Sequence, residues 1–201
     1  MDQRPDVINL QPVDGVYVPS TAVGGAPESP AGPNARLATR PTARFMRGHL
    51  AHWIALGFGS GLARWAPGTF GTLWGWLAFE VLQGWLNPVQ MGVLIAVSLP
   101  VGWWACKVTA QHLGLADPGS IVWDEIVAIW LILWLVTPTS FGGEVAAFAL
   151  FRYFDAAKPG PVAWADQRFK GFGWRGSFGI MFDDLVAAFC TLLVIALWRW
   201  F

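Results

Sequence analysis

The sequence predicts an all-α fold: a multi-helix integral membrane bundle of about five apolar helices, some of them short or re-entrant. Of the 201 residues, 55% are apolar and only 13% are charged, about half the charged fraction of an ordinary soluble domain. Many of the 14 tryptophans lie near the ends of apolar runs, where membrane interfaces favour amphipathic rings. A soluble core rich in tryptophan is the alternative, and the length of the apolar runs argues against it.

Residues 1–43 form the first of two predicted domains, a disordered tail rich in proline and glycine. The tail holds seven of the 14 prolines and shows little apolar periodicity, so it cannot bury enough surface to offset the entropy of ordering. It opens MDQRPDVINLQPVDGVYVP, without the apolar segment of a secretory signal peptide. We therefore expect the N-terminus to stay in the cytoplasm, and residues 44–201 to form a helical membrane domain.

The second domain opens with a short amphipathic segment, RFMRGHLAHWIALGF, over residues 44–58. Its basic and aromatic residues predict a helix that lies on an anionic membrane surface. His49 and His52 lie three residues apart on this segment. Because no third ligand stands nearby in the sequence, we expect these histidines to be structural rather than a metal site.

Five apolar segments follow, and two turn signals divide them into hairpins. The turns are Asn87–Pro88 and the stretch from Thr137 to Gly143. Several of the segments are shorter than the ~20 residues that a full membrane crossing prefers. The five segments are 70–86, 89–108, 121–138, 143–156 and 183–201.

These hairpins place three polar regions on one face of the membrane: residues 57–72, 109–125 and 155–184. Lysine and arginine crowd the third region, whereas the opposite turns carry Glu144 and neither basic residue. Because basic residues favour the cytoplasmic side, we predict a multi-pass protein of a bacterial-type inner (cytoplasmic) membrane with its polar regions in the cytoplasm. The formal net charge of zero gives no indication of a nucleic-acid partner, and the sequence leaves the oligomeric state open.

The first polar region, GFGSGLARWAPGTFGT, has the composition of a phosphate-binding loop. Its glycines allow the backbone to approach a phosphate, and its hydroxyls and one guanidinium can bind phosphate oxygens. It lacks the GKS or GKT end of a nucleotide P-loop, which argues against ATP. A flexible glycine-rich loop at the membrane surface is the alternative. The candidate phosphate-binding residues are Ser60, Arg64, Thr69, Thr72 and, from the third region, Lys158.

The second polar region ends in SIVWDEIVAIW, where Asp124 and Glu125 stand at the start of an apolar helix. Carboxylates at membrane depth are energetically unfavourable and tend to mark function, which favours a magnesium site over a solvated helix end. Adjacent residues on a helix diverge by about 100°. One carboxylate is therefore expected to bind metal, while the other pairs with a cation or caps the helix N-terminus.

The third polar region, extended to residues 151–184, holds most of the remaining charge. Arg152, Asp155 and Lys158 recur every three residues, so a helix would place them in one polar stripe that presents cations to a phosphate. An internal ladder of ion pairs is the alternative. Asp183 and Asp184 are expected to open the last apolar helix. Together these carboxylates form an acidic cluster of the hard oxygen ligands that magnesium requires.

Four sequence blocks, taken together, resemble the phosphatidylglycerophosphatase A family over approximately residues 45–195. The blocks are GFGSGLARWAPGTFGT, GSIVWDEIV, FRYFDAAKPGPV with WADQ, and GIMFDD, in that order. The resemblance implies a magnesium-dependent lipid phosphatase that hydrolyses the terminal phosphomonoester of phosphatidylglycerophosphate to give phosphatidylglycerol and phosphate. The N-terminal tail and the stretch GFGWRGSFGIM depart from the family's pattern, and the second departure puts a role for Arg175 in doubt.

Elimination of the possible nucleophiles favours attack by a metal-activated water. Neither Cys106 nor Cys190 is followed by an arginine six residues on, and no histidine lies in a histidine-based phosphatase motif. A DxDxT nucleophile loop is also absent from the sequence. An aspartyl-phosphate on Asp183 or Asp184 stays open as a second route.

The expected roles follow from this scheme. Carboxylates are expected to hold the Mg²⁺ ion: Asp124, Asp155 and Asp184. The catalytic residues would accept the proton of the water or stabilise the transferring phosphoryl group: Asp183, Glu125, Lys158 and Arg152. Backbone amides from residues 57–72 would be secondary donors.

Two rival functions belong to other classes. A small membrane transporter or channel would spread its charges across the depth of the membrane, whereas nearly all of them lie at segment ends here, with Glu80 the exception. Another phospholipid headgroup enzyme, a transferase, would require a carboxylate-rich DGxxAR pattern. GLAR at residues 61–64 lacks both the aspartate and the spacing.

Overall fold

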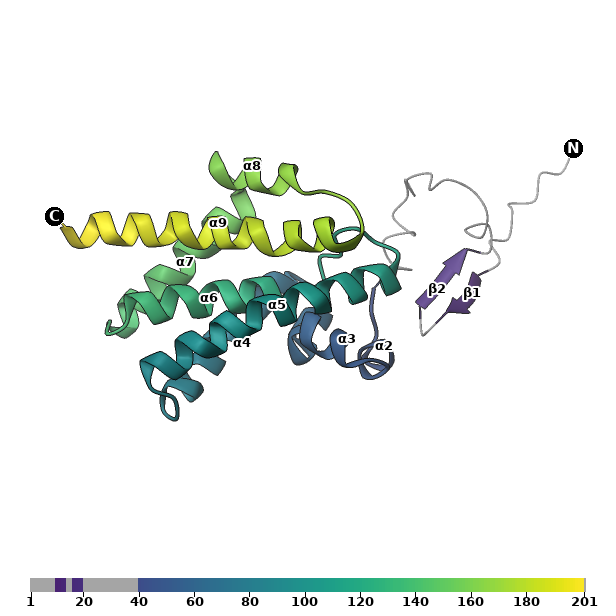
Figure 1. The fold of residues 1–201 in the computed structure, drawn as a ribbon, viewed down its shortest axis with the longest axis horizontal. Coiled ribbons are helices and arrows are strands. Elements are labelled where there is room, and N and C mark those ends of the chain that lie inside the picture. The colour runs from purple at the N-terminus through teal and green to yellow at the C-terminus, as the bar shows by residue number, and fades with distance from the viewer. Residues whose placement is uncertain (1–9, 14–15, 20–39, 201) are drawn as a thin grey trace, which may run out of the picture.

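The computed structural model describes residues 10–13, 16–19 and 40–200, and residues 40–200 form a bundle of helices (Figure 1). The long helices are α4 (Pro67–Gln83), α5 (Pro88–Leu113), α6 (Trp123–Val136), α7 (Phe141–Ala157) and α9 (Gly173–Trp200). The short ones are α2 (Ala43–Arg47), α3 (Leu50–Ala55), the 3₁₀ helix η2 (Gly57–Leu62) and α8 (Pro161–Arg168). The helical prediction is confirmed for this part of the chain, because each of the five predicted apolar segments overlaps one long helix.

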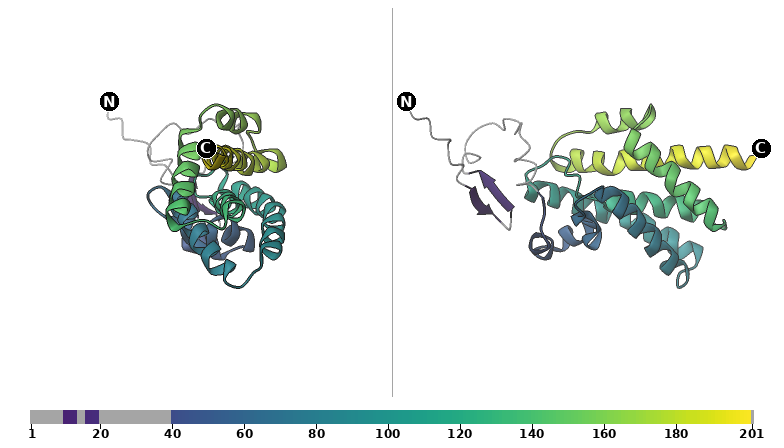
Figure 2. Two further views of the ribbon diagram at one scale, coloured as in Figure 1. Left: turned by 90° about the vertical axis from the view of Figure 1, so that its left-hand side faces the viewer. Right: turned by 180° about the vertical axis from the view of Figure 1, so that it is seen from behind.

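Helix α6 lies at the centre of the bundle. Seen along the bundle axis, it is enclosed by α4, α5, α7 and α9 (Figure 2, left). After its first turn the sequence is apolar on every side, and Val127, Ile129 and Ile132 are wholly buried. A helix that is apolar all round belongs inside a core. The other long helices therefore pack on α6.

Helix α4 approaches α6 closely because two glycines lie one turn apart. A Cβ atom at Gly71 would lie 2.6 Å from the Cβ of Val122, and one at Gly75 would lie 2.8 Å from Cγ2 of Ile129. Small residues at this spacing let two helix backbones come together. The Trp130 indole N–H also donates to the Gly75 carbonyl at 2.8 Å. The start of α4 is thereby held beside the start of α6.

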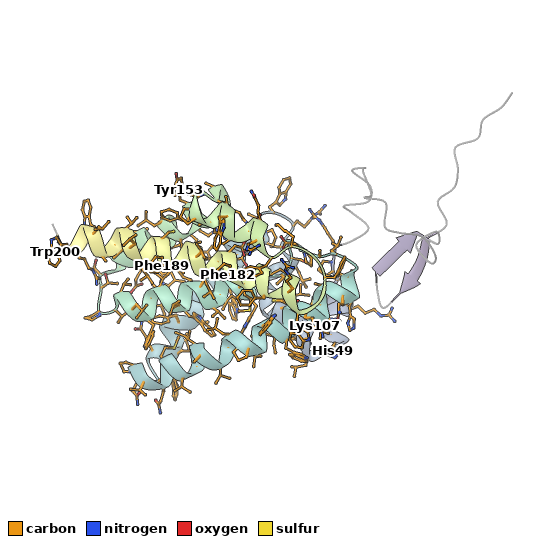
Figure 3. All side chains as sticks on the ribbon, turned by 45° about the horizontal axis from the view of Figure 1, so that its top comes forward. His49, Lys107, Tyr153, Phe182, Phe189 and Trp200 are labelled. Carbon is orange, nitrogen blue, oxygen red and sulfur yellow. The ribbon has the colours of Figure 1, made fainter. Side chains whose placement is uncertain are left out.

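Two helices, α5 and α9, are long and apolar enough to cross a membrane. Only 33% and 39% of their most apolar windows are buried, so a large part of each window is at least partly exposed on the outside of the bundle. On α9 the exposed side chains include Phe189 and Trp200, which are labelled in Figure 3. These features fit a membrane-associated protein. Of the five membrane helices predicted, only these two meet the length and composition of a full crossing within the described residues.

The connections between the long helices gather at opposite ends of the bundle. The turns from α4 to α5 and from α6 to α7 lie at one end, and the loops that lead into α6 and α9 lie at the other (Figure 1). Both turns are built on capping residues: Asn87 Oδ1 accepts from Gln90 N at 3.0 Å, and Ser140 Oγ accepts from Gly143 N at 3.2 Å. The two predicted hairpins therefore exist, and the polar loops share one end.

Two helical segments differ from the expectation. The amphipathic stretch is not one helix: α2 ends at Gly48, and His49 starts α3 by accepting the Ala51 N–H at 3.1 Å. The last helix begins at Gly173 instead of position 183, so the acidic pair does not open it. Helix α8 was not predicted, because its sequence contains no apolar run, and it packs against α9.

The N-terminal segment contains two short strands. β1 (Leu10–Val13) and β2 (Val16–Pro19) pair in an antiparallel hairpin, where the sequence suggested no regular structure. The remaining residues up to 39 lie outside the described part of the chain. The disorder expected for residues 1–43 therefore stays a prediction.

Candidate functional site

Three carboxylates from two helices meet near the polar end of the bundle. Asp124 and Glu125 come from α6 and Asp184 comes from α9, and one oxygen of each lies within 4.8 Å of the others. Glu125 is 9% exposed and Asp184 only 3% exposed. Carboxylates buried this close together repel one another unless a cation or protons compensate them. We call these three residues the acidic group.

The Asp124–Glu125 pair owes its place to the start of α6. Val122, just before the helix, donates its N–H to the Ala55 carbonyl at 2.9 Å, which ties this point to α3. Asp124 Oδ1 accepts the N–H of Glu125 at 3.0 Å. Negative charge is favourable at a helix N-terminus, so the local structure stabilises both carboxylates where they stand.

The start of α4 closes over Glu125. A Cβ atom at Gly68 would lie 2.1 Å from Glu125 Oε1 and 3.3 Å from Arg152 Nη1. A side chain at position 68 would therefore push the helix away from the acidic group. Because the first N–H groups of a helix have no partner within it, this approach brings backbone donors near the carboxylates.

Arg152 borders the acidic group from α7. Its Nη1 donates to the Asp155 carboxylate and to Thr72 Oγ1 at 3.4 Å, and it lies 3.7 Å from Glu125 Oε1. Thr72 in turn donates to the Gly68 carbonyl at 2.8 Å. Arg152 and Asp155 thus face the same way from one turn of α7, as their spacing predicted.

Lys158 ends α7 instead of continuing the stripe. It caps the helix in a left-handed conformation, with φ 46° and ψ 51°, just before Pro159. Its Nζ donates to Asp166 of α8 and to Asp183 of α9 at 2.6 Å. Burial would lower the pKa of Lys158, but the hydrogen bonds to Asp166 and Asp183 raise it above its usual value. The lysine therefore stays protonated and links three helices.

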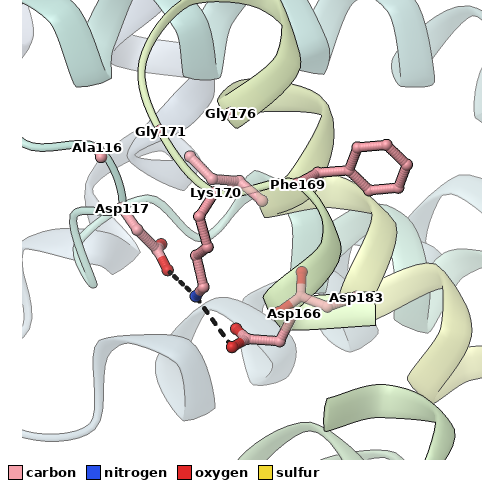
Figure 4. A pocket seen from close by; sticks show the side chains of 10 residues that line it. Ala116, Asp117, Asp166, Phe169, Lys170, Gly171, Gly176 and Asp183 are labelled. Atoms are coloured by element: carbon pink, nitrogen blue, oxygen red, sulfur yellow. Dashed lines mark ion pairs between the residues drawn. The ribbon is translucent and has the colours of Figure 1, made fainter. Parts of the chain in front are cut away.

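A small cavity of about 80 Å³ lies beside Asp183 (Figure 4). Lys170 Nζ stands at its edge, 2.9 Å from Asp166 Oδ2 and 3.6 Å from Asp117 Oδ2. Burial would raise the pKa of Asp166, whereas hydrogen bonds from Lys158 and Lys170 hold it below its usual value. Alternating charges thus run from Asp117, before α6, to Asp183 on α9.

Two buried carboxylate oxygens at the site have no hydrogen-bond partner in the described part of the chain: Glu125 Oε2 and Asp183 Oδ1. The carboxylate oxygens of Asp124, Glu125 and Asp184 lie within 4.8 Å of one another, so their negative charges would repel. A divalent cation would remove this repulsion and supply the missing partner. The acidic group is compatible with one.

Two of the three predicted metal ligands lie in the acidic group, and the third, Asp155, lies beside it and interacts with Asp184. Asp124 and Asp184 lie in the acidic group, while Asp155 pairs with Arg152 and Glu125 takes the third place. Asp155 is also close enough to Glu125 for their charges to repel each other. Asp183, expected beside them, is turned to Lys158.

The predicted phosphate ligands do not gather at one point. Thr72 contacts Arg152 beside the acidic group, and Thr69 lies in the first turns of α4. Ser60 Oγ donates to the Gly57 carbonyl at 2.9 Å within its own turn. Arg64 lines a separate cleft next to the loop before α6.

Sequence reasoning missed three residues of the site: Gly68, Asp166 and Lys170. Gly68 was one glycine among many, and only its distance to Glu125 distinguishes it. Asp166 lies in the WADQ block, and Lys170 follows it by four residues. Opposite charges four residues apart on a helix commonly pair, so the Asp166–Lys170 ion pair could have been predicted from the sequence.

Known proteins resemble this chain in sequence over most of its length. The family model described as phosphatidylglycerophosphatase A matches residues 53–199. A Haemophilus influenzae protein named phosphatidylglycerophosphatase A is 38% identical over 150 residues, which cover 74% of this chain and 89% of that protein. An Escherichia coli protein of the same name is 38% identical over 141 residues, covering 68% of this chain and 76% of that protein. The search of solved structures found no match.

Proposed function

The chain belongs to the phosphatidylglycerophosphatase A family, and from this membership we propose that its acidic group carries out the hydrolysis of phosphatidylglycerophosphate to phosphatidylglycerol and phosphate. The observation that carries the proposal is the meeting of Asp124, Glu125 and Asp184 with Arg152 directly beside them. A phosphatase needs to neutralise phosphoryl oxygens and to orient a nucleophile. This arrangement offers groups for both tasks.

The acidic group would hold the divalent cation, and its ligand chemistry favours Mg²⁺. All three ligand atoms are carboxylate oxygens, and Glu125 Oε2 is buried without a partner in the described residues. Magnesium prefers hard oxygen ligands and shares its shell with waters and substrate phosphates. When bound, such an ion neutralises phosphoryl oxygens and makes a water more acidic.

The chain's own cations have separate tasks in this proposal. Arg152, 18% exposed at its side chain, would donate to the phosphoryl oxygens from the edge of the acidic group. Lys158 stays protonated, so it serves as a fixed positive charge and not as a proton donor. Asp183 Oδ2 accepts a hydrogen bond from Lys158. Its other oxygen, Oδ1, has no partner among the described residues and would accept a hydrogen bond from the attacking water.

The assignment is tested by phosphate release from phosphatidylglycerophosphate in detergent micelles. We expect turnover with Mg²⁺, no turnover in excess EDTA, and recovery when Mg²⁺ is added back. Undiminished turnover in excess EDTA would contradict the metal assignment. Turnover absent under every condition, in folded protein, would contradict the activity itself.

We also propose that the protein crosses the membrane several times with the acidic group at the cytoplasmic side. The support is the gathering of the polar loops at one bundle end and the basic residues in those loops. Cysteines placed at Ser60, Gly119 and Gly171 should react with impermeant reagents only from the cytoplasmic side of sealed vesicles. Cysteines at Asn87 and Ser140 should react only from the other side, and a motif loop labelled from there would overturn the topology.

A further inference from the structure

We propose that a second anion site, separate from the acidic group, binds a phosphodiester in the cleft flanked by Arg40 and Arg64. The proposal rests on the proposed function, because it gives a place to the part of the lipid headgroup that does not react. It also gives Arg64 a role other than contact with the transferring phosphoryl group.

The cleft has a volume of about 470 Å³, which is within the range of small-molecule sites. It lies between residues 61–67 and residues 115–120, with Arg40 at its edge. Gly61 makes this contact possible, since a Cβ atom there would lie 2.1 Å from the Ser120 carbonyl oxygen. The close approach places Arg64 beside the loop that leads into α6.

The charge of the cleft is positive. Arg40 and Arg64 are exposed, and within the described residues neither guanidinium has an ion pair or a side-chain hydrogen bond. Asp117 also lines the cleft, but its carboxylate is shared with Lys170 at 3.6 Å. The Ser120 hydroxyl adds a neutral donor. Two unpaired guanidinium forks beside an enclosed space suit the oxygens of a phosphate ester.

The cleft adjoins the acidic group at one point and the small cavity beside Asp183 at another. Pro67 lines the cleft, and the next residue, Gly68, is the one that meets Glu125. Asp117 lines both the cleft and the small cavity that contains Asp183. Phosphatidylglycerophosphate carries a phosphodiester and a phosphomonoester on the two ends of one glycerol. With its monoester at the acidic group, the lipid would have its diester one glycerol away, which is within reach of the adjoining cleft.

A phosphate oxyanion could come from the substrate's own diester, from a neighbouring anionic lipid or from free phosphate. Micelles of a neutral detergent remove the second source, because they contain no other phospholipid. Three constants then separate the remaining two: KM for phosphatidylglycerophosphate, the inhibition constant of phosphatidylglycerol, which has the diester alone, and that of inorganic phosphate.

We expect Arg64→Gln and Arg40→Gln each to raise KM and the inhibition constant of phosphatidylglycerol about tenfold, as for loss of one charged hydrogen-bonding partner. The value of kcat and the inhibition constant of inorganic phosphate should change less than about twofold. Arg64→Lys, which keeps the charge and loses the fork, should lie in between. Arg168→Gln is the matched control, because Arg168 is an exposed arginine on α8 that does not line the cleft.

Two results would overturn the proposal. One is an unchanged KM in both variants. The other is a fall in kcat together with weaker inhibition by inorganic phosphate, which would place Arg64 at the reacting phosphoryl group. Direct binding of phosphatidylglycerol to the purified protein separates this proposal from the activity: binding that depends on Arg64 supports the cleft even if no phosphate is released, and binding indifferent to Arg64 refutes it.

Discussion

The two acidic pairs, Asp124–Glu125 and Asp183–Asp184, look alike in the sequence and are used differently in the structure. Both members of the first pair lie in the acidic group. They stand at the start of α6, where Asp124 Oδ1 accepts a hydrogen bond from the backbone N–H of Glu125. The second pair lies within α9, where adjacent side chains diverge by about 100°. Asp184 reaches the acidic group and Asp183 reaches Lys158. Position in the helix, and not adjacency in the sequence, decides which carboxylates lie in the acidic group.

The largest expected effect comes from splitting the second pair. Asp184→Asn should lower kcat on the order of a hundredfold and raise the Mg²⁺ concentration needed for half-maximal activity, since it removes a proposed ligand. Asp183→Asn should lower kcat about tenfold with an unchanged Mg²⁺ requirement. Activity measured against Mg²⁺ concentration distinguishes the two. Equal Mg²⁺ requirements in both variants would contradict the proposal that Asp184 binds the metal ion and Asp183 does not.

An intermediate effect is expected at Asp155, which the sequence placed among the metal ligands. Because Asp155 pairs with Arg152, Asp155→Asn should lower kcat about tenfold and added Mg²⁺ should not restore it. Combined with Arg152→Gln, the two losses should be far from additive, since both variants break one interaction. Recovery of Asp155→Asn by Mg²⁺ would instead make Asp155 a ligand, as first expected.

The smallest expected effect concerns acid stability at Asp166, the residue that holds Lys158 in place. The pKa of Asp166 is lowered in the fold, so its contribution to stability is present above its ordinary pKa and is lost as pH falls through the lowered value. Asp166→Asn should therefore reduce the Tm by roughly 2–4 °C at neutral pH. That deficit should shrink below about pH 4.

The control for Asp166 is Asp117→Asn. Asp117 shares Lys170 with Asp166, but both members of that pair are 53% exposed at their side chains, and exposed ion pairs add little stability. Thermal unfolding in detergent across pH gives both comparisons. A neutral-pH deficit as large for Asp117→Asn as for Asp166→Asn would show that burial does not separate the two residues.

The helices could be predicted from the sequence, and their exact limits could not. Apolar runs marked every long helix, and Asn87 and Ser140 marked the turns between them. The first turns of α9 were missed because Gly176 and Gly179 suggested a loop. Their function is to let residues 169–171 pack on the helix: a Cβ at Gly179 would lie 2.1 Å from the Phe169 carbonyl oxygen. A glycine needed for tertiary contact looks the same in a sequence as one needed for a turn.

The site was predictable as a gathering of carboxylates and not as a set of roles. The two predicted hairpins place Asp124 and Asp184 at the same end of the bundle, and in the structure both lie in the acidic group. Glu125 lies within the group and Asp155 beside it, paired with Arg152. That arrangement depends on how α6 and α7 are rotated against each other, which the periodicity of the sequence does not reveal. The position of Lys158 depends on its left-handed conformation at the end of α7. Its contact with Asp166 depends on helix α8, which was not predicted from the sequence.

The length of α9 ahead of its carboxylates sets the depth of the reaction. The helix starts at Gly173, and at 1.5 Å per residue Asp183 lies ~15 Å along it. If α9 crosses the bilayer as its length allows, the carboxylates lie beneath the outer edge of the lipid headgroups. Nitroxides on exposed positions from Trp174 to Phe189 would report this depth through their relative accessibility to oxygen and to a nickel chelate. A phosphate at that level would stay with its lipid in the leaflet. Water and the metal ion would then travel inward to the substrate, and the freed phosphate would leave along the same path.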